Sequence, residues 1–279
     1  GQFDSSINFG QGPLPTSGQN DVFVAHFTPA GGIIWGNSYG NAASQLSNAV
    51  AANAQGDLII GGRVEGTMDF GLGLLTGMGQ GDAFAAKFTG VGTPIWSKSW
   101  GDAQIQVTTA TAIDGAGNLF VAGIYKGSID FGLGALPNAA ALRPFVAKFD
   151  PLGVPLWNKA FSGVYSVLFS RSVAIDAAGN LLIFGRLNGS ADFGGGMRSS
   201  LGPADNLFLV KLDSAGNHLW SHVHGGTGVD FDGGAENQCY DACAADITCS
   251  EWSNWNRYGQ IVVTLPASGM GARARMAIA

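Results

Sequence analysis

The feature that most constrains the fold of this chain is an internal repeat of about 61 residues. A polar residue followed by Phe-Gly recurs at spacings of 61, 61 and 62 residues, beginning at Asn8, Asp69, Asp130 and Asp192. A tryptophan recurs in step with it, at Trp35, Trp96, Trp157 and Trp220. Since a fixed period is typical of repeat architectures, these markers predict several copies of one supersecondary unit.

Each repeat contains four short apolar runs separated by turns rich in Gly, Asn and Asp, which predicts four antiparallel strands. In one complete copy these runs are 48–53, 58–64, 83–89 and 94–100. A four-stranded antiparallel unit repeated radially is a propeller blade. The sequence therefore predicts an all-β fold, a β-propeller of four-stranded blades.

The copies predict a single domain over residues 1–279 with four blades. Three copies are complete, at 46–100, 107–161 and 169–223. The segments at about 1–40 and 240–265 each supply half a copy, and Gly1-Gln2-Phe3 aligns with Gly62-Arg63-Val64. We expect the two halves to form one composite blade that closes a four-bladed ring. The alternative is a piece of a larger propeller or array, whose open ends would need capping.

The repeats resemble the bacterial seven-bladed β-propeller repeat, or SBBP repeat, family. The matching segments are 69–73, 145–150, 174–180 and the Leu-Trp pairs at 156–157 and 219–220. The resemblance covers about 1–225 and returns faintly at 242–264. It implies an exported bacterial protein, often surface-associated, with no activity assigned to the family as a whole. Only four copies are visible here, and the irregular insertion 227–258 departs from the pattern.

Charge and hydropathy exclude some partners. The chain has 14 basic and 20 acidic residues, a net charge of −6, so it is a poor candidate for binding a phosphate backbone. No stretch of some 18 apolar residues predicts a membrane span, and no charged-then-apolar leader is present. A leader removed ahead of Gly1 fits the extracellular or cell-surface location that the resemblance implies.

Three sets of repeated side chains could carry either structure or function. The carboxylates of Asp69, Asp130 and Asp192 favour turn capping, because a short polar side chain can accept nearby backbone N–H groups. The repeated tryptophans favour packing between blades, with sugar-stacking platforms as the alternative. A cation recurs at one strand position and favours a solvated strand face over the lining of a ring; its members are Lys87, Lys148, Lys211 and His26.

A histidine-rich run is a candidate metal site. A regular strand alternates its side chains, which places His218, His222 and His224 on one face. Imidazoles in a His-x-His pattern can ligate zinc or copper. The alternative is an exposed outer strand without a metal.

The irregular insertion holds the other candidate sites. Asp230, Asp232 and Glu236 form a partial calcium-loop pattern, with a plain polar loop as the alternative, and calcium is the one cofactor that the sequence suggests. Three clustered cysteines allow one disulfide and a spare thiol. Cys249 could join Cys239 or Cys243, and we take Cys239 with Cys249 as the candidate pair.

An aromatic loop within the insertion is a candidate binding surface. Thr248 to Tyr258 replaces a three-residue turn, and exposed rings in a loop can stack on a sugar or contact a protein. The candidate residues are Trp252, Trp255, Arg257 and Tyr258. Alternatively, the loop plugs the ring or covers the closing blade.

No nucleophile elbow, phosphate-binding loop, dinucleotide fingerprint or His-Glu-x-x-His motif occurs. The leading hypothesis is a non-catalytic exported scaffold or adhesion protein with a protein or glycan partner at the cell surface. A carbohydrate-binding propeller is the first alternative. A metal-dependent enzyme, or a subunit of a larger surface assembly, is the second.

Overall fold

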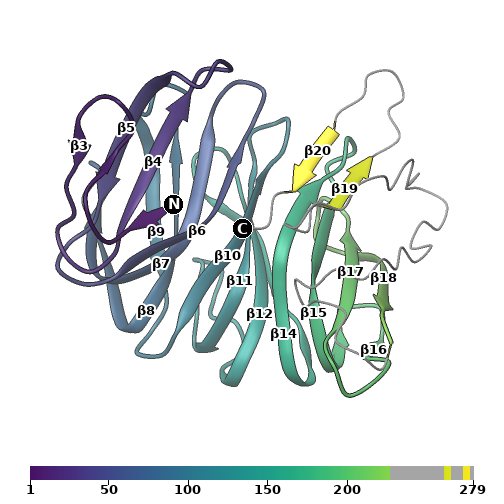
Figure 1. The fold of residues 1–279 in the computed structure, drawn as a ribbon. Helices are drawn as coiled ribbons and strands as arrows, with labels where there is room; N and C mark the ends of the chain where they lie inside the picture. Colours follow the sequence, from purple (N-terminus) through teal and green to yellow (C-terminus); the bar gives the residue numbers. More distant parts are fainter. Residues whose placement is uncertain (227–260, 265–272, 277–279) are drawn as a thin grey trace. The chain divides into compact units, whose positions relative to one another are not determined.

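The computed structural model describes residues 1–226, 261–264 and 273–276, and every regular element in them is a β-strand (Figure 1). The predicted all-β class is confirmed. The described residues contain no helix long and apolar enough to cross a membrane. The chain divides into two compact units, residues 1–161 and 162–279.

Two four-stranded antiparallel sheets form most of the first unit, and each is a meander in which the strands pair in chain order. The first sheet consists of β6 Gln45–Ala52, β7 Leu58–Asp69, β8 Leu74–Phe88 and β9 Pro94–Trp100. The second consists of β10 Gln106–Ile113, β11 Leu119–Gly127, β12 Ala139–Phe149 and β13 Pro155–Ala160. We call these sheets, with their loops, repeat 1 and repeat 2.

Five-residue polar turns join the first two strands of each repeat. In repeat 1, the side-chain oxygen of Asn53 accepts the backbone N–H of Asp57 at 2.9 Å, and in repeat 2 Asp114 accepts that of Asn118 at 2.8 Å. The fourth turn residue has a left-handed φ of +87° at Gly56, which is a conformation that glycine adopts without steric cost. The turn sequence therefore determines where each hairpin reverses.

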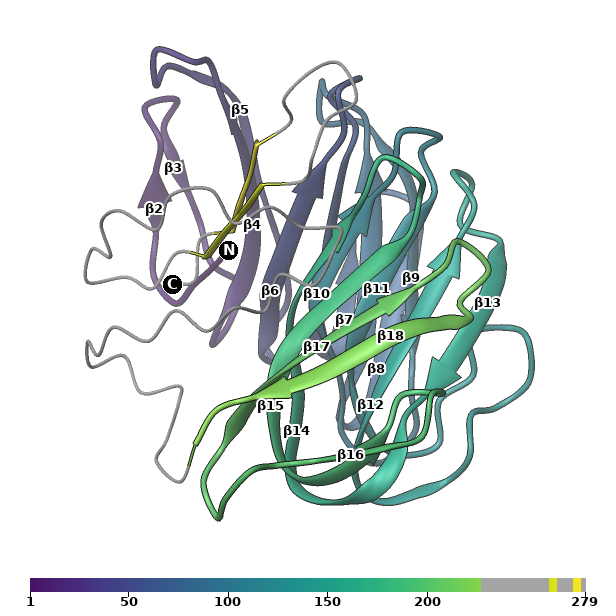
Figure 2. The same ribbon diagram turned by 90° about the vertical axis from the view of Figure 1, so that its right-hand side faces the viewer.

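Residues 1–39 form a half repeat with a three-stranded sheet (Figure 2). Its strands are β1 Gln2–Phe3, β4 Asp21–Phe27 and β5 Ile33–Tyr39, and a separate hairpin joins β2 Ile7–Asn8 to β3 Pro13–Leu14. Phe3 pairs with Asp21, as Val64 pairs with Asp82 in repeat 1. Thus β1 corresponds to residues 63–64 in the middle of β7, and the expected alignment of residues 1–3 with 62–64 is confirmed.

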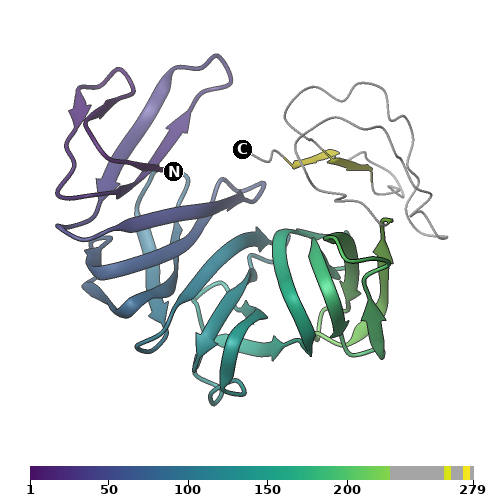
Figure 3. The ribbon, with the colours of Figure 1, turned by 60° about the horizontal axis from the view of Figure 1, so that its bottom comes forward.

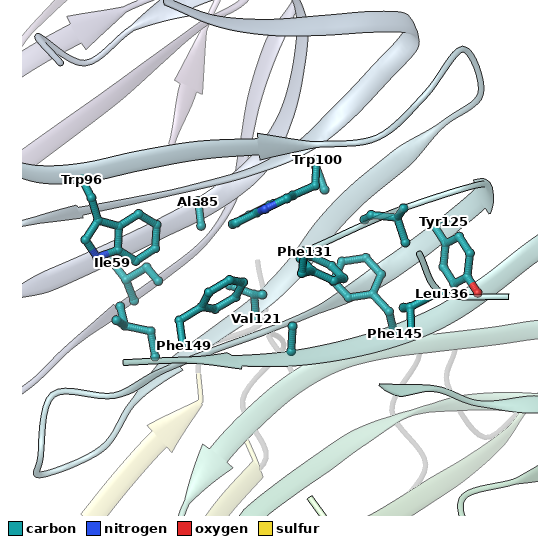
Figure 4. Close-up of a cluster of buried hydrophobic side chains, with 14 of the residues drawn as sticks. Ile59, Ala85, Trp96, Trp100, Val121, Tyr125, Phe131, Leu136, Phe145 and Phe149 are labelled. Atoms are coloured by element: carbon teal, nitrogen blue, oxygen red, sulfur yellow. The ribbon is translucent and has the colours of Figure 1, made fainter. Parts of the chain in front are cut away.

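A hydrophobic cluster joins repeat 1 to repeat 2, whose first strand β10 packs on β6, β7 and β8 (Figures 3 and 4). Trp100 stacks on Phe149, with ring centroids 5.2 Å apart. Ile59 and Ala85 come from repeat 1, and Val121 from repeat 2. Full burial of a large apolar side chain stabilises a fold by about 1.5–3 kcal/mol, so this cluster holds the two sheets together.

A β-bulge precedes the tryptophan in every copy. The register between the last two strands skips one residue, so that residue has no direct partner. The bulged residues are Ile34, Ile95, Leu156 and Leu219. Since an extra residue reverses the alternation of side chains, the residues before and after it lie on opposite faces of the strand.

The second unit begins with a sheet that carries the third complete copy, which we call repeat 3. Its strands pair in the order β14-β15-β17-β18, and β16 pairs with β15. They are β14 Ser162–Ile175, β15 Leu181–Asp192, β16 Met197–Ser199, β17 Asn206–Leu212 and β18 His218–His224.

Two short strands lie near the end of the sequence. β19 Ile261–Thr264 pairs with β20 Arg273–Met276, with Ile261 opposite Met276. The expected pairing of 259–264 with the half repeat is not among the strand pairs of the described residues. The four-bladed ring and its composite blade stay predictions.

Candidate functional site

The Asp-Phe-Gly loop is a cap on its own backbone. One carboxylate oxygen of Asp69 accepts the N–H groups of Gly71, Leu72 and Gly73 at 2.6, 3.1 and 3.0 Å. The pKa of Asp69 is lowered, and the hydrogen bond from the Gly71 N–H is the largest cause. With its oxygen occupied by backbone donors, Asp69 holds the turn and is poorly placed for acid–base chemistry.

The other copies repeat this geometry. The first bond of the cap is 2.8 Å from Gly10 to Asn8, 2.7 Å from Gly132 to Asp130 and 2.7 Å from Gly194 to Asp192. The phenylalanine of each loop packs on a phenylalanine of the third strand, in the pairs Phe9–Phe23, Phe70–Phe84, Phe131–Phe145 and Phe193–Phe208. The motif therefore fastens a polar loop to an apolar sheet face.

In the half repeat and in repeat 1, the tryptophan and the cation meet at one carbonyl of the next copy. The indole N–H of Trp96 and the ammonium of Lys87 each donate to the Pro151 carbonyl, both at 3.3 Å. One repeat earlier, Trp35 donates to the Gly90 carbonyl at 3.0 Å, and Nδ1 of His26 lies 2.9 Å from the same oxygen. Two donors on one carbonyl tie the half repeat to repeat 1, and repeat 1 to repeat 2.

The same turn is shaped to receive the indole. Gly92 has a φ of +83°, and a Cβ added there would lie 2.8 Å from Cδ2 of Trp35. Gly153 has the same relation to Trp96, with a φ of +79°. Glycine is required here by both the left-handed backbone and the lack of space.

The expected solvated face for the lysines is wrong. Lys87 is 3% exposed and Lys148 is 6% exposed. Their ammonium groups pair with Asp57 at 3.4 Å and with Asp114 at 4.0 Å, carboxylates of the turn that joins the first two strands. Lys211 pairs likewise with Asp176, at 3.1 Å. A buried charge must be paired, and the Asp that each of these turns carries at its first or fifth position was the signal that a partner was present.

Sequence reasoning missed a polar network at the entry to repeats 1 and 2. Gln106 is fully buried, and its amide donates to Asp102 and to the Lys126 carbonyl, both at 2.7 Å. Gln45 occupies the equivalent position 61 residues earlier and donates to Asn41 at 2.7 Å. The repetition of Gln at this spacing could have identified the network.

A buried carboxyl group lies beside the network in the half repeat and in repeat 1, at Asp21 and Asp82. Asp82 is buried and accepts the Met78 N–H at 3.1 Å. The pKa of Asp82 is raised to about 6. Burial is the largest cause, and the neighbouring charge of Asp102 acts in the same direction. Burial works in the same direction on Asp102, but its hydrogen bonds from Gln104, Ser128 and Gln106 outweigh burial and lower its pKa.

The predicted three-histidine face is wrong, because the bulge at Leu219 intervenes. Trp220, His222 and His224 lie on one face of β18, with ring centroids 5.4 Å apart for the first two and 5.9 Å for the last two. His218 pairs with Leu212 while Trp220 pairs with Lys211, which places His218 on the opposite face. There it contacts Ser221 Oγ at 3.0 Å.

Both half-buried histidines of this strand favour their neutral form. The pKa of His218 is lowered mainly by burial and further by the charge of Arg198. The pKa of His224 is lowered mainly by burial and further by the charge of His222. Within residues 1–226 and the two short C-terminal strands, no group of three or more His, Cys, Asp or Glu side chains could hold a metal ion.

The other candidate sites lie outside the described residues. These are the acidic loop with Asp230, Asp232 and Glu236, the cysteines Cys239, Cys243 and Cys249, and the aromatic residues Trp252, Trp255, Arg257 and Tyr258.

Comparison with known proteins adds no further assignment. No protein-family model matches the chain, and a search of curated proteins finds no significant match.

Proposed function

We propose that this chain is an exported, non-catalytic scaffold that presents loops to a protein or glycan partner, built as a β-propeller of SBBP-like repeats. The proposal rests on the observation that the repeated polar side chains bind other parts of the chain itself. Asp69 caps its own loop, while Lys87 and Trp96 bind the turn of the next copy. Repetition thus supplies shape and rigidity, and specificity is left to segments that do not repeat.

The described copies favour the scaffold over a lectin that stacks sugars on repeated indoles. Trp96 is buried, and Trp35 and Trp96 both direct the indole N–H at a backbone carbonyl of the following copy. A sugar platform needs an exposed ring face. A glycan partner would then bind to the aromatic loop 248–258.

We further propose that residues 242–264 complete the half repeat and close a four-bladed ring. β1 pairs only with Val22 and Asp21 of β4, whereas β7 pairs with β8 from Asp82 to Phe88. Phe27 is 42% exposed, while Phe88, its counterpart, is fully buried. The run Ile261-Val262-Val263 resembles Leu181-Leu182-Ile183, and it would cover the apolar part of β4 that β1 leaves uncovered.

The repeat predicts the register of this closing strand. Leu58 pairs with Phe88, so its equivalent Ile261 would pair with Phe27, and Val263 would pair with Ala25. Ala25→Cys with Val263→Cys, in a chain whose three native cysteines are serines, should form an intramolecular disulfide on mild oxidation. Ala25→Cys with Thr264→Cys is the out-of-register control. A monomer without the cross-link, or cross-linked dimers alone, would contradict the closed ring.

Protease treatment of intact native cells tests the exported scaffold. The protein should be cleaved while an internal marker protein survives, and native material should elute with a bound partner at a size above that of the monomer. Protection until the cells are lysed would rule out a surface location. A bare monomer in the surface fraction would rule out the scaffold role.

A further inference from the structure

The face of β18 that carries Trp220 also carries two imidazoles, at the positions that Lys98 and Trp100 occupy in repeat 1. His222 and His224 are two residues apart beyond the bulge, so both side chains project from the same face. Their ring centroids lie 5.9 Å apart with an angle of 35° between the planes. Two rings on one metal ion have centroids at most about 6.5 Å apart when each metal–nitrogen bond is about 2 Å. The separation of His222 and His224 lies within this limit.

A ring nitrogen of His224 lacks a hydrogen-bond partner among the described residues. This nitrogen, Nε2, is buried. A buried polar atom left without a partner costs about 1–3 kcal/mol, so native structures normally supply one. A metal ion held between the two rings would be such a partner.

We propose that His222 and His224 form a two-imidazole site for a divalent transition-metal ion, with copper(II) the preferred ion. Copper(II) favours tetragonal sites of nitrogen and oxygen donors and is the tightest-binding divalent first-row ion at such ligands. Two adjacent imidazoles supply two of the positions, and water or a small anion takes the others. No further His, Cys, Asp or Glu joins them in the part of the chain that the structure describes.

The strand itself provides matched controls. The chain has four histidines: His222 and His224 in the proposed site, His218 on the opposite face of β18, and His26 in the half repeat. Sequence alternation alone would group His218 with the pair, whereas the bulge removes it. Substituting each histidine separately therefore distinguishes a site formed by His222 and His224 from copper binding by histidines in general.

The experiment is a titration of the full chain with copper(II) sulfate, followed by calorimetry and by electron paramagnetic resonance. The wild type should bind one equivalent and show the hyperfine pattern of two imidazole nitrogens. His222→Ala and His224→Ala should each weaken binding about tenfold or more, which corresponds to about 1.4 kcal/mol. His218→Ala and His26→Ala should bind as the wild type does. Circular dichroism and thermal unfolding of each variant check that the fold is intact.

Two results would overturn the proposal. The first is a folded His222→Ala/His224→Ala variant that keeps the wild-type affinity, which would place the ion elsewhere, on the cysteines or the terminal amine. The second is an equal loss of affinity in folded His218→Ala. Zinc(II) and nickel(II) provide a final check, because both should bind more weakly than copper(II) at a site of this kind.

Discussion

The half repeat and repeat 1 have the same local geometry but differ in burial. Asn8 and Asp69 cap equivalent loops, and Trp35 and Trp96 bind equivalent carbonyls. Yet Phe27 is 42% exposed while Phe88 is fully buried. Local motifs therefore form wherever the sequence places them, whereas burial depends on which strands cover them.

Replacing Phe88, the counterpart of Phe27, should have the largest effect on stability. Phe88→Ala should lower the free energy of unfolding by about 3–5 kcal/mol, because it removes a ring from a close-packed core. Phe27→Ala should cost less than half as much, since the structure leaves much of that ring in water. Urea denaturation followed by tryptophan fluorescence measures both. Equal losses would mean that another segment covers Phe27 in solution.

Asp82 should make stability depend on pH. Its pKa is raised from 3.8 to about 6, so between these values the folded protein keeps a proton that the unfolded chain has released. The contribution of Asp82 to the free energy of unfolding is thus most favourable below pH 3.8 and is lost as the pH rises to about 6. Asp82→Asn should be more stable than the wild type above pH 7, with the advantage fading near pH 4. Denaturant titrations across this range test it, and a difference independent of pH would contradict it.

A buried hydroxyl group in repeat 2 allows a substitution that should stabilise the protein, by less than Phe88→Ala destabilises it. Thr111 is 7% exposed, and its Oγ1 is buried without a hydrogen-bond partner among the described residues. Thr111→Val keeps the shape, removes the unsatisfied group and should stabilise the protein by about 1–3 kcal/mol. Val50, the counterpart in repeat 1, is 69% exposed, so Val50→Thr should change stability by less than about 0.5 kcal/mol. Destabilisation by Thr111→Val would show that the hydroxyl has a partner in solution.

The loop cap should show the smallest effect. Asn8 already does in the half repeat what Asp69 does in repeat 1. Asp69→Asn should therefore leave the thermal midpoint unchanged, while Asp69→Ala should lower it, because three backbone N–H groups lose their acceptor. If Asn is as damaging as Ala, the charge and not the geometry holds the loop.

Much of the fold could be predicted from the sequence because the repeat occurs in several copies that check one another. The strand order within repeat 1 and the alignment of Gly1-Gln2-Phe3 with residues 62–64 of β7 both followed from the repeat. The candidate sites were less predictable. Lys87 looks solvent-exposed in a list of residues, since burial of a charge depends on Asp57, about 30 positions away, reaching it across the sheet.

The sequence by itself determined the period, the all-β class and the turns, because glycines with left-handed φ and polar caps act within a few residues. Only the tertiary structure decided which charges are buried, and which histidines share a face. A bulge is a property of strand pairing: Leu219 is skipped because β17 pairs with residues on either side of it. That single skipped residue reverses the alternation and separates His218 from His222 and His224.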